Sequence, residues 1–204
     1  MIRAIIFDIG GVIVTEEANR VILKTTKKFG IGRDDFNNAT KIKFKETFTG
    51  KIDILDWYTD IVSRLEIDVD PKEMFKSHLE TYKTITKKPN LDIINLVERL
   101  KDNYKIGCLS NIENQIAKYN LNRGLFDVFG DNVFLSCEMG IMKPNPEIFN
   151  IVLKKLGSVP EETIFIDDNP ENIKAANKLG IHGILFKGYE QLIRDLDELG
   201  VNNS

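Results

Sequence analysis

Four short stretches of this 204-residue sequence each place side chains capable of chemistry directly after an apolar run. The residues concerned are Asp8 after Ala4–Phe7, Ser110 and Asn111 after Ile106–Leu109, Lys143 in a loop after Val133–Leu135, and Asp167 and Asp168 after Thr163–Ile166. Taken singly, such residues are ordinary helix caps or solvated loop charges. Their joint occurrence after successive apolar runs indicates one site.

The three carboxylates would repel one another strongly if they met in the folded protein. Asp8 facing Asp167 and Asp168 across neighbouring strands is a cluster of like charges that requires a cation. Hard carboxylate oxygens of this kind favour Mg²⁺. The sequence therefore predicts a Mg²⁺ site between these carboxylates.

The apolar runs, with a fifth at Gly183–Phe186, lack the alternation of a half-exposed strand. Continuous apolar character is typical of parallel strands that are covered on both faces. Helices separate the later runs: one begins at Asn145-Pro146 and ends at Gly157, and another begins at Asn169-Pro170 and ends at Gly180. This alternation predicts an α/β fold with a doubly wound, Rossmann-like parallel sheet.

Residues 15–86 interrupt the alternation, because they contain no convincing strand and show helical periodicity instead. Breaks at Gly30–Gly32, Gly50 and Asp70-Pro71 divide them into about four helices. An insertion after the first strand lies over the edge where open α/β sheets bind ligands. We therefore expect an α/β core of residues 1–14 and 87–204, and a helical lid of residues 15–86.

Composition restricts the function classes without choosing among them. Hydrophobic residues make up 42% and charged residues 29%, with a net charge of −3, which is typical of a globular enzyme or binding module. This balance predicts no nucleic-acid partner and no membrane association. Asp8 interrupts the apolar start and no signal cleavage site follows, so we expect a cytoplasmic protein in which Cys108 is a buried thiol. Its oligomeric state, monomer or weak dimer, stays open.

The four motifs, in this order, resemble those of the haloacid dehalogenase-like (HAD) hydrolases. Gly140-x-x-Lys143-Pro144 and Ile166-Asp167-Asp168-Asn169 are particularly specific together, and the resemblance extends over essentially the whole chain. Residues 15–86 resemble the small helical cap that many members carry after the first motif. The resemblance implies a Mg²⁺-dependent phosphatase that hydrolyses a small phosphate monoester, with sugar phosphates among the expected substrates.

The resemblance also implies a role for each motif residue. Asp8 would be the nucleophile and form an aspartyl-phosphate that water hydrolyses. Lys143 would neutralise the charge that develops on the phosphoryl oxygens. The metal would be held by Asp8, the Gly10 carbonyl, Asp168 and, through water, Asp167, while Ser110 and backbone amides near Gly11 and Asn111 would bind the phosphoryl group.

The first motif departs from the family at two positions. Gly10 stands where most family phosphatases have a second Asp that protonates the leaving group, and Val12 replaces the usual Thr. General acid–base help is worth about 10²–10⁴-fold, so its loss matters. One reading is a phosphatase that prefers leaving groups needing little protonation, such as sugar 1-phosphates or aryl and acyl phosphates.

Two other readings stay open. A metal-independent 2-haloacid dehalogenase needs no leaving-group acid, but Arg20 and Arg33 are the only candidates for a halide cradle near the start of the cap. A non-catalytic phosphate-binding protein would also keep the motif residues.

Outside the motifs, we expect mostly structural residues. His78 is predicted to lie on the surface, and Trp57 and Tyr58 to pack between cap helices or line the substrate pocket. Lys45 and Glu46 could reach a leaving group, but a solvated helix face is the stronger expectation.

Overall fold

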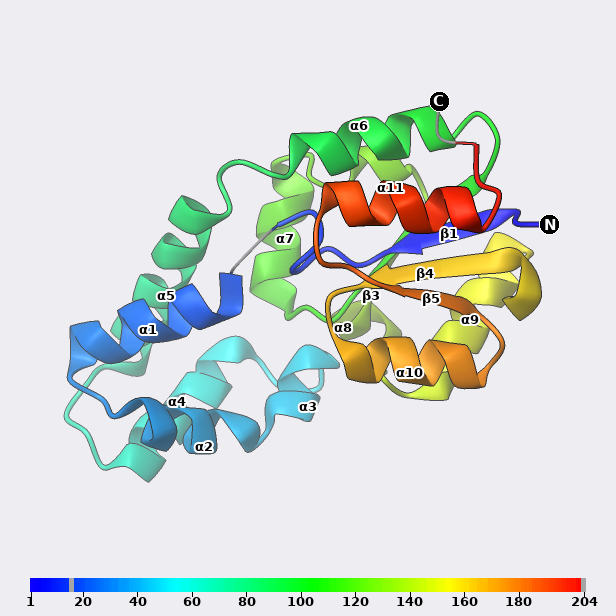
Figure 1. Ribbon diagram of the computed structural model, residues 1–204. Coiled ribbons are helices and arrows are strands. Elements are labelled where there is room, and N and C mark those ends of the chain that lie inside the picture. Colours follow the sequence, from blue (N-terminus) through cyan, green and yellow to red (C-terminus); the bar gives the residue numbers. More distant parts are fainter. Residues whose placement is uncertain (15–16, 203–204) are drawn as a thin grey trace.

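The computed structural model describes residues 1–14 and 17–202 and contains a five-stranded sheet whose strand pairings are all parallel. The strands lie in the order β3-β2-β1-β4-β5 (Figure 1). Their bounds are β1 Ala4–Phe7, β2 Lys105–Ser110, β3 Val133–Leu135, β4 Thr163–Asp167 and β5 His182–Leu185. The predicted α/β fold with a doubly wound parallel sheet is confirmed, and each strand limit lies within one residue of its apolar run.

Helices cover both faces of the sheet, which explains why its strands are continuously apolar. Ile5 and Phe7 of β1 join one buried cluster, with α6 and α11, while Ala4 and Ile6 join a second cluster, with α9 and α10. Figure 1 shows these two helix pairs on opposite sides of the strands. The helices and short 3₁₀ turns of this part are α6 (Leu91–Leu100), α7 (Asn114–Asn122), η1 (Asp127–Phe129), α8 (Ser136–Met139), α9 (Pro146–Leu156), η2 (Pro160–Glu162), α10 (Pro170–Lys178) and α11 (Tyr189–Glu198).

The predicted starts of α9 and α10 are confirmed by their capping bonds. The Asn145 side chain accepts a hydrogen bond from the Glu147 N–H at 3.0 Å, and the Asn169 side chain accepts one from the Glu171 N–H at 2.9 Å. Gly157 ends α9 in the left-handed conformation, with φ of 57°. The cap of α10 fixes the backbone immediately after Asp168.

Among the described residues between β1 and α6 there are five helices, where the sequence predicts about four. They are α1 (Glu17–Phe29), α2 (Arg33–Lys41), α3 (Phe44–Phe48), α4 (Ile54–Leu65) and α5 (Pro71–Ile85). The missed boundary is at Lys43, which has a left-handed φ of 58° and separates α2 from α3 without a glycine or proline. We call α1–α5 the helical segment.

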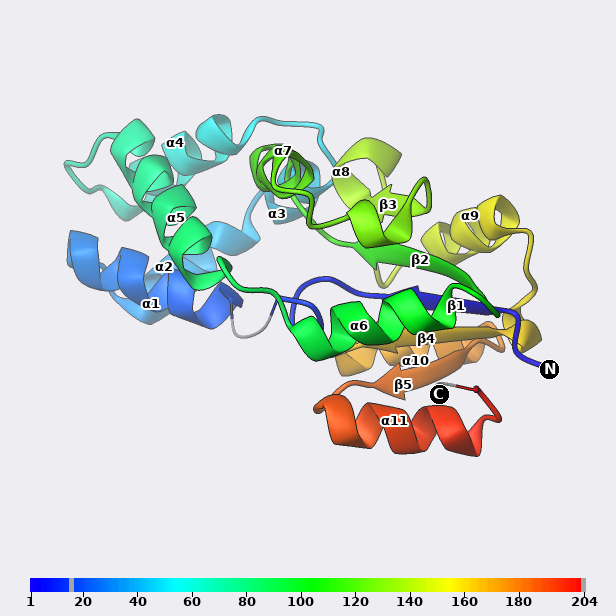
Figure 2. The same ribbon diagram turned by 90° about the horizontal axis from the view of Figure 1, so that it is seen from above.

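The helical segment has its own buried cluster, centred on Phe36, Trp57, Tyr58 and Met74. Figures 1 and 2 show it at one end of the sheet, with the N-terminus at the opposite end. Among the residues that the structure describes, no helix has the length and apolar character needed to cross a membrane.

Several contacts hold the helical segment against the sheet-containing part. The Asn90 N–H donates to the Ile13 carbonyl at 2.7 Å. This bond joins the chain segment that precedes the helical segment to the one that follows it. The Ser136 hydroxyl donates to the Phe48 carbonyl at 2.6 Å. Gly50 packs so closely that a Cβ there would lie 2.2 Å from the Cys137 carbonyl oxygen. The end of α3 is therefore fixed against the start of α8.

Gly50→Ala should weaken this junction, because the added methyl group meets backbone and because φ at Gly50 is +71°. We expect a loss of more than about 2 kcal/mol in the free energy of unfolding, measured by denaturant titration. Gly30→Ala is the matched control, since Gly30 has a φ of +66° but nothing within 4 Å of the added Cβ, and should lose only about 1 kcal/mol. Equal losses in the two variants would contradict the close contact.

Candidate active site

The predicted site residues come together because β1 lies between β2 and β4 in the sheet. Asp8 directly follows β1, Ser110 is the last residue of β2, and Asp167 is the last residue of β4. The carboxyl ends of parallel strands share one edge, and ligands bind at that edge in open α/β sheets. All three residues are almost completely buried there.

Lys143 reaches this edge from the loop between α8 and α9 and lies between two carboxylates. Its Nζ is 2.9 Å from Asp8 Oδ1 and 2.6 Å from Asp167 Oδ2. The side chain is 1% exposed, and its ammonium also lies 5.2 Å from the centroid of the Phe165 ring. The two carboxylate partners offset the free-energy cost of removing this ammonium from water.

Lys143, Asp8 and Asp167 form a buried triad of one cation and two anions, in which the pKa values of Asp8 and Lys143 are shifted for different reasons. Burial raises the pKa of Asp8 to about 7, Lys143 opposes that shift, and the charge of Asp167 adds to it. The two carboxylates raise the pKa of Lys143 despite its burial. Lys143 therefore stays charged at neutral pH, while burial, with a smaller contribution from the charge of Asp167, holds Asp8 near the midpoint of its ionisation.

Asn111 holds the loop that carries Lys143. Its side-chain oxygen accepts from the Lys143 N–H, and its side-chain amide donates to the Lys143 carbonyl, both at 2.9 Å. This reciprocal pair fixes the Lys143 backbone directly beside the end of β2. The sequence points only to the Asn111 backbone amide, because the partner lies 32 residues away along the chain.

Asp167 is committed to protein donors through both of its oxygens. Oδ1 accepts from the Asn169 N–H at 2.8 Å, and Oδ2 accepts from the Asn172 amide at 2.9 Å in addition to Lys143. Asn172 lies in the first turn of α10, which places its amide over the end of β4. Sequence reasoning missed this residue, although its position in the first turn of the helix that follows the paired aspartates was a usable signal.

Asp168 is more exposed and approaches the backbone of the first motif. A Cβ on Gly11 would lie 2.0 Å from Asp168 Oδ2, and Gly11 has a φ of +74°, so only glycine fits there. Burial and the charge of Asp167 raise the pKa of Asp168. Asp8, Asp167 and Asp168 each offer a carboxylate oxygen, and these oxygens lie within 4.8 Å of one another.

The donor set fits a hard divalent cation. Three carboxylates and one ammonium leave an excess of negative charge, which a bound divalent cation would offset. Mg²⁺ prefers one or two carboxylates together with water and substrate oxygens. The less committed oxygens of Asp8 and Asp168 suit direct ligation better than those of Asp167.

The backbone of the first motif is folded into a tight turn. The Gly11 N–H donates to the Val14 carbonyl at 2.8 Å, so in this conformation that amide is occupied and is not available to a phosphoryl oxygen. A Cβ added at Gly10 would meet nothing within 4 Å, and φ at Gly10 is not positive. Val12 is fully buried in the core.

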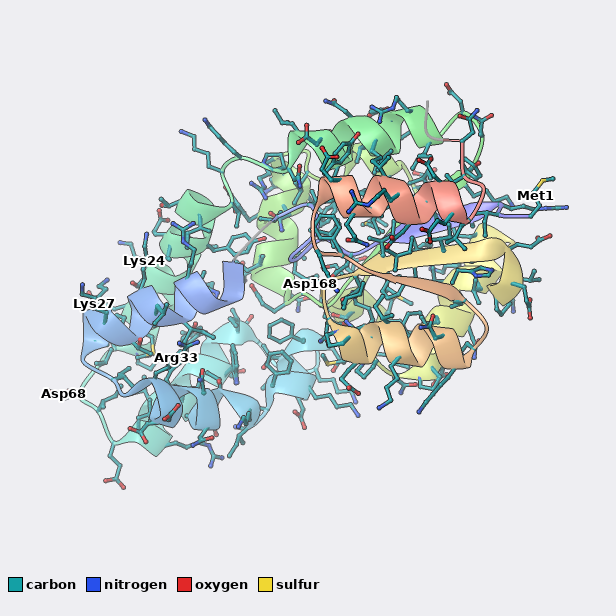
Figure 3. The ribbon with its side chains drawn as sticks, in the orientation of Figure 1. Met1, Lys24, Lys27, Arg33, Asp68 and Asp168 are labelled. Atoms are coloured by element: carbon teal, nitrogen blue, oxygen red, sulfur yellow. The ribbon has the colours of Figure 1, made fainter. Side chains whose placement is uncertain are left out.

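A cavity of about 500 Å³ extends from this edge into the helical segment. Asp8, Ser110, Asn111, Lys143 and Asp168 line it on the side of the sheet. The opposite side carries the aromatic residues of the helical segment, which are Phe36, Phe44, Phe48, Trp57, Tyr58 and Tyr82. The volume is in the ordinary range of small-molecule sites. Figure 3 shows Asp168 at the junction of the two parts.

The surface position predicted for His78 is wrong. His78 lines the cavity, and its Nδ1 is 2.6 Å from the Tyr58 hydroxyl. Burial lowers the pKa of His78 to about 4, so the imidazole is neutral at physiological pH. A single histidine among Lys and Glu residues is typical of an exposed helix face. The sequence does not show that His78 lies on the face of α5 that contacts Tyr58.

The expectations for Trp57, Tyr58, Lys45 and Glu46 are confirmed. Trp57 and Tyr58 are buried between its helices and also line the cavity, whereas Lys45 and Glu46 are exposed and lie outside the lining. Cys108 is completely buried, as predicted.

Two positions considered for a halide cradle lie elsewhere. Within the described ranges 1–14 and 17–202, no arginine belongs to the cavity lining, and both Arg20 and Arg33 are exposed. Figure 3 places Arg33 in the helical segment, away from Asp168.

Glu113 is a buried carboxylate of the cavity that the sequence reading missed. It caps α7 by accepting from the N–H groups of Gln115 at 2.7 Å and Ile116 at 2.6 Å. Burial raises its pKa, and the two N–H bonds oppose that shift. Its position just after Ser110-Asn111 was the available signal.

Comparison with protein families agrees with this geometry. The family model described as a haloacid dehalogenase-like hydrolase matches residues 2–180. A D-ribitol-5-phosphate phosphatase from Bacteroides thetaiotaomicron is 27% identical over 191 residues, covering 88% of this chain and 89% of the relative. The sesquiterpene phosphatase astK from Aspergillus oryzae is 29% identical over 187 residues, covering 89% and 88% respectively.

Two further comparisons are a shorter sequence match and a solved structure. Flavin mononucleotide hydrolase 1 from Arabidopsis thaliana is 44% identical over 71 residues, and the match spans only 29% of that relative's length. A HAD family enzyme from Bacteroides thetaiotaomicron, solved in complex with magnesium and inorganic phosphate, superposes with a TM-score of 0.72 at 25% identity, covering 95% of this chain and all of that one.

The buried triad makes stability depend on pH through Asp8. Its folded pKa of about 7 exceeds the unfolded value of about 3.9, so the folded state binds the extra proton and wild type loses stability as pH rises from about 4 to 7. Asp8→Asn removes that loss. In EDTA we expect the free energy of unfolding of Asp8→Asn to gain on that of wild type by about 2–3 kcal/mol between pH 5 and pH 8, measured by denaturant titration at both pH values. A difference that is constant with pH would contradict the raised pKa.

Proposed function

The chain belongs to the haloacid dehalogenase-like hydrolases, and from that premise we propose that it is a Mg²⁺-dependent phosphatase that hydrolyses a small phosphate monoester. The observation that carries the proposal is the Lys143 ammonium between Asp8 and Asp167, with the Asp168 carboxylate beside them, at one end of a cavity. This combination supplies a nucleophile, a fixed cation and a metal site at one place.

Asp8 is the proposed nucleophile. Its Oδ1 accepts from the Ile9 N–H at 2.7 Å and from Lys143, so we assign the attack to Oδ2. A bond forms between this oxygen and phosphorus while the bond from phosphorus to the leaving-group oxygen breaks. Water then attacks phosphorus, which releases inorganic phosphate and restores the carboxylate.

The other residues bind and neutralise the transferred group. Lys143 faces the charge that spreads over the phosphoryl oxygens, and Asn111 keeps its loop in place. Ser110, at the end of β2, is the proposed hydroxyl donor to the phosphoryl group. Gly11 contributes by letting Asp168 approach the first motif rather than through its own amide.

The proposed metal ligands are Asp8, Asp168 and the Gly10 carbonyl, with Asp167 acting through water. When bound there, Mg²⁺ supplies the positive charge that lets an anionic nucleophile approach an anionic phosphoryl group. Asp167, held by Lys143, Asn169 and Asn172, keeps the Lys143 side chain aimed at Asp8.

We propose that residues 15–86 form a cap over a core of residues 1–14 and 87–204. The described helices of that range supply the far wall of the cavity, so they exclude water from the reacting atoms and contact the leaving group.

Both cysteines are buried free thiols, which supports a cytoplasmic location. The printed names of the relatives cover a polyol phosphate, a flavin nucleotide and a sesquiterpene, so they do not choose the leaving group.

Phosphate release from p-nitrophenyl phosphate tests the reaction. We expect turnover with Mg²⁺, its loss in EDTA, and a fall of at least about 10³-fold in Asp8→Asn, because the nucleophile is removed. Lys174→Gln is the matched control, since Lys174 is an exposed residue of α10 outside the cavity lining. Activity that survives both EDTA and Asp8→Asn would overturn the proposal.

Gly10 makes a separate prediction about the leaving group. The space beside Gly10 is open, so Gly10→Asp is expected to fold and to restore the missing general acid. We expect kcat for alkyl monoesters to rise about 10²-fold, while p-nitrophenyl phosphate, whose leaving group needs little protonation, changes less than about threefold. The measurement is steady-state phosphate release from both ester types. An equal effect on the two would argue against a missing acid at this position.

A further inference from the structure

The cap side of the cavity is apolar to an extent that the chemistry at Asp8 does not require. Six aromatic residues form what we call the aromatic wall, namely Phe36, Phe44, Phe48, Trp57, Tyr58 and Tyr82. The other cap residues of the lining are Val21, Ile22 and Ile54, which are aliphatic, and Thr40 and His78. Among cap side chains that the structure describes, residues 20–85, none that lines the cavity is charged at neutral pH.

Most polar atoms on the cap side of the cavity already have partners within the protein. Trp57 Nε1 donates to the Ile42 carbonyl at 2.9 Å, and Thr40 Oγ1 donates to the Asn37 carbonyl at 2.9 Å. The Tyr58 hydroxyl is paired with His78, and the Tyr82 hydroxyl accepts from the Asn120 amide at 2.8 Å. A polyhydroxylated leaving group would lose water here and find few new hydrogen bonds.

The aromatic wall is also held in place. Phe44 and Phe48 stack with ring centroids 4.1 Å apart, and each meets Trp57 edge-on at 6.1 Å. The backbone of Phe48 accepts the Ser136 hydroxyl from the sheet-containing part, and Gly50 packs against Cys137. The rings therefore face the phosphoryl end of the cavity from a fixed position.

From this wall we propose that the substrate is a phosphate monoester of an apolar alcohol or phenol, rather than of a sugar or polyol. The inference rests on the proposed phosphatase function and names the leaving group for that same site. The phosphoryl group lies at Asp8 and Lys143, and the hydrocarbon lies against the aromatic wall. Burial of apolar surface, not hydrogen bonding, then provides the affinity for the leaving group.

Competitive inhibition by n-alkylphosphonates tests this without requiring their turnover. With p-nitrophenyl phosphate as substrate and Mg²⁺ present, the inhibition constant should fall about fourfold per added methylene from ethyl- to hexylphosphonate. 3,4-Dihydroxybutylphosphonate, matched in length to butylphosphonate, should bind at least tenfold more weakly than butylphosphonate. Benzylphosphonate distinguishes a phenol from an aliphatic alcohol as the leaving group. Tighter binding than that of hexylphosphonate indicates a phenol-like group, and weaker binding indicates a hydrocarbon chain.

Phe44 provides the variant, because it lines the cavity yet is 37% exposed and so contributes little to the core. Phe44→Gln should weaken hexylphosphonate about tenfold and leave dihydroxybutylphosphonate unchanged. Leu23→Gln is the control, since Leu23 is an exposed apolar residue of α1 outside the cavity lining. A flat series of inhibition constants, or tighter binding of the diol, overturns the apolar leaving group, whereas absence of p-nitrophenyl phosphate turnover overturns the proposed function itself.

Discussion

The Lys143 ammonium, buried between Asp8 and Asp167, is the interaction on which the rest of the site depends. Without it two carboxylates would face each other across neighbouring strands in a region of low dielectric. The Asn111 side chain makes two hydrogen bonds to the Lys143 backbone, and the Phe165 ring lies against the Lys143 ammonium. Since one cation does not balance three carboxylates, the edge keeps an excess of negative charge that suits a divalent metal.

Much of the sheet-side site could be predicted, because its geometry follows from local sequence. A residue that directly follows a buried parallel strand lies at the carboxyl edge whatever the rest of the chain does, which is why Asp8, Ser110 and Asp167 were found. The Asn145 and Asn169 caps are equally local. The Asn111–Lys143 pair, the Gly50 contact with Cys137 and the inward position of His78 depend on segments that meet only in the folded protein. Sequence periodicity does not show which distant segments come into contact.

The two parts of the molecule divide the chemistry between them. In the proposed reaction the sheet supplies the charged groups that act on phosphorus, and the helical segment supplies a fixed aromatic surface against which the leaving group lies. Gly10 belongs to the boundary, since the open space beside it is where a leaving-group acid would stand. A site without that acid, facing apolar rings, favours affinity through burial and relies on the leaving group for its own departure.

We propose that the carboxylates around Lys143 form a Mg²⁺ site in which Asp168 is a direct ligand. Isothermal titration calorimetry with MgCl₂ tests it most directly, using wild type, Asp168→Asn and, as control, Glu171→Gln, an exposed carboxylate of α10 outside the cluster. Mg²⁺ should bind at least about tenfold more weakly to Asp168→Asn than to wild type, and with wild-type affinity to Glu171→Gln. Equal affinity in all three proteins would contradict it.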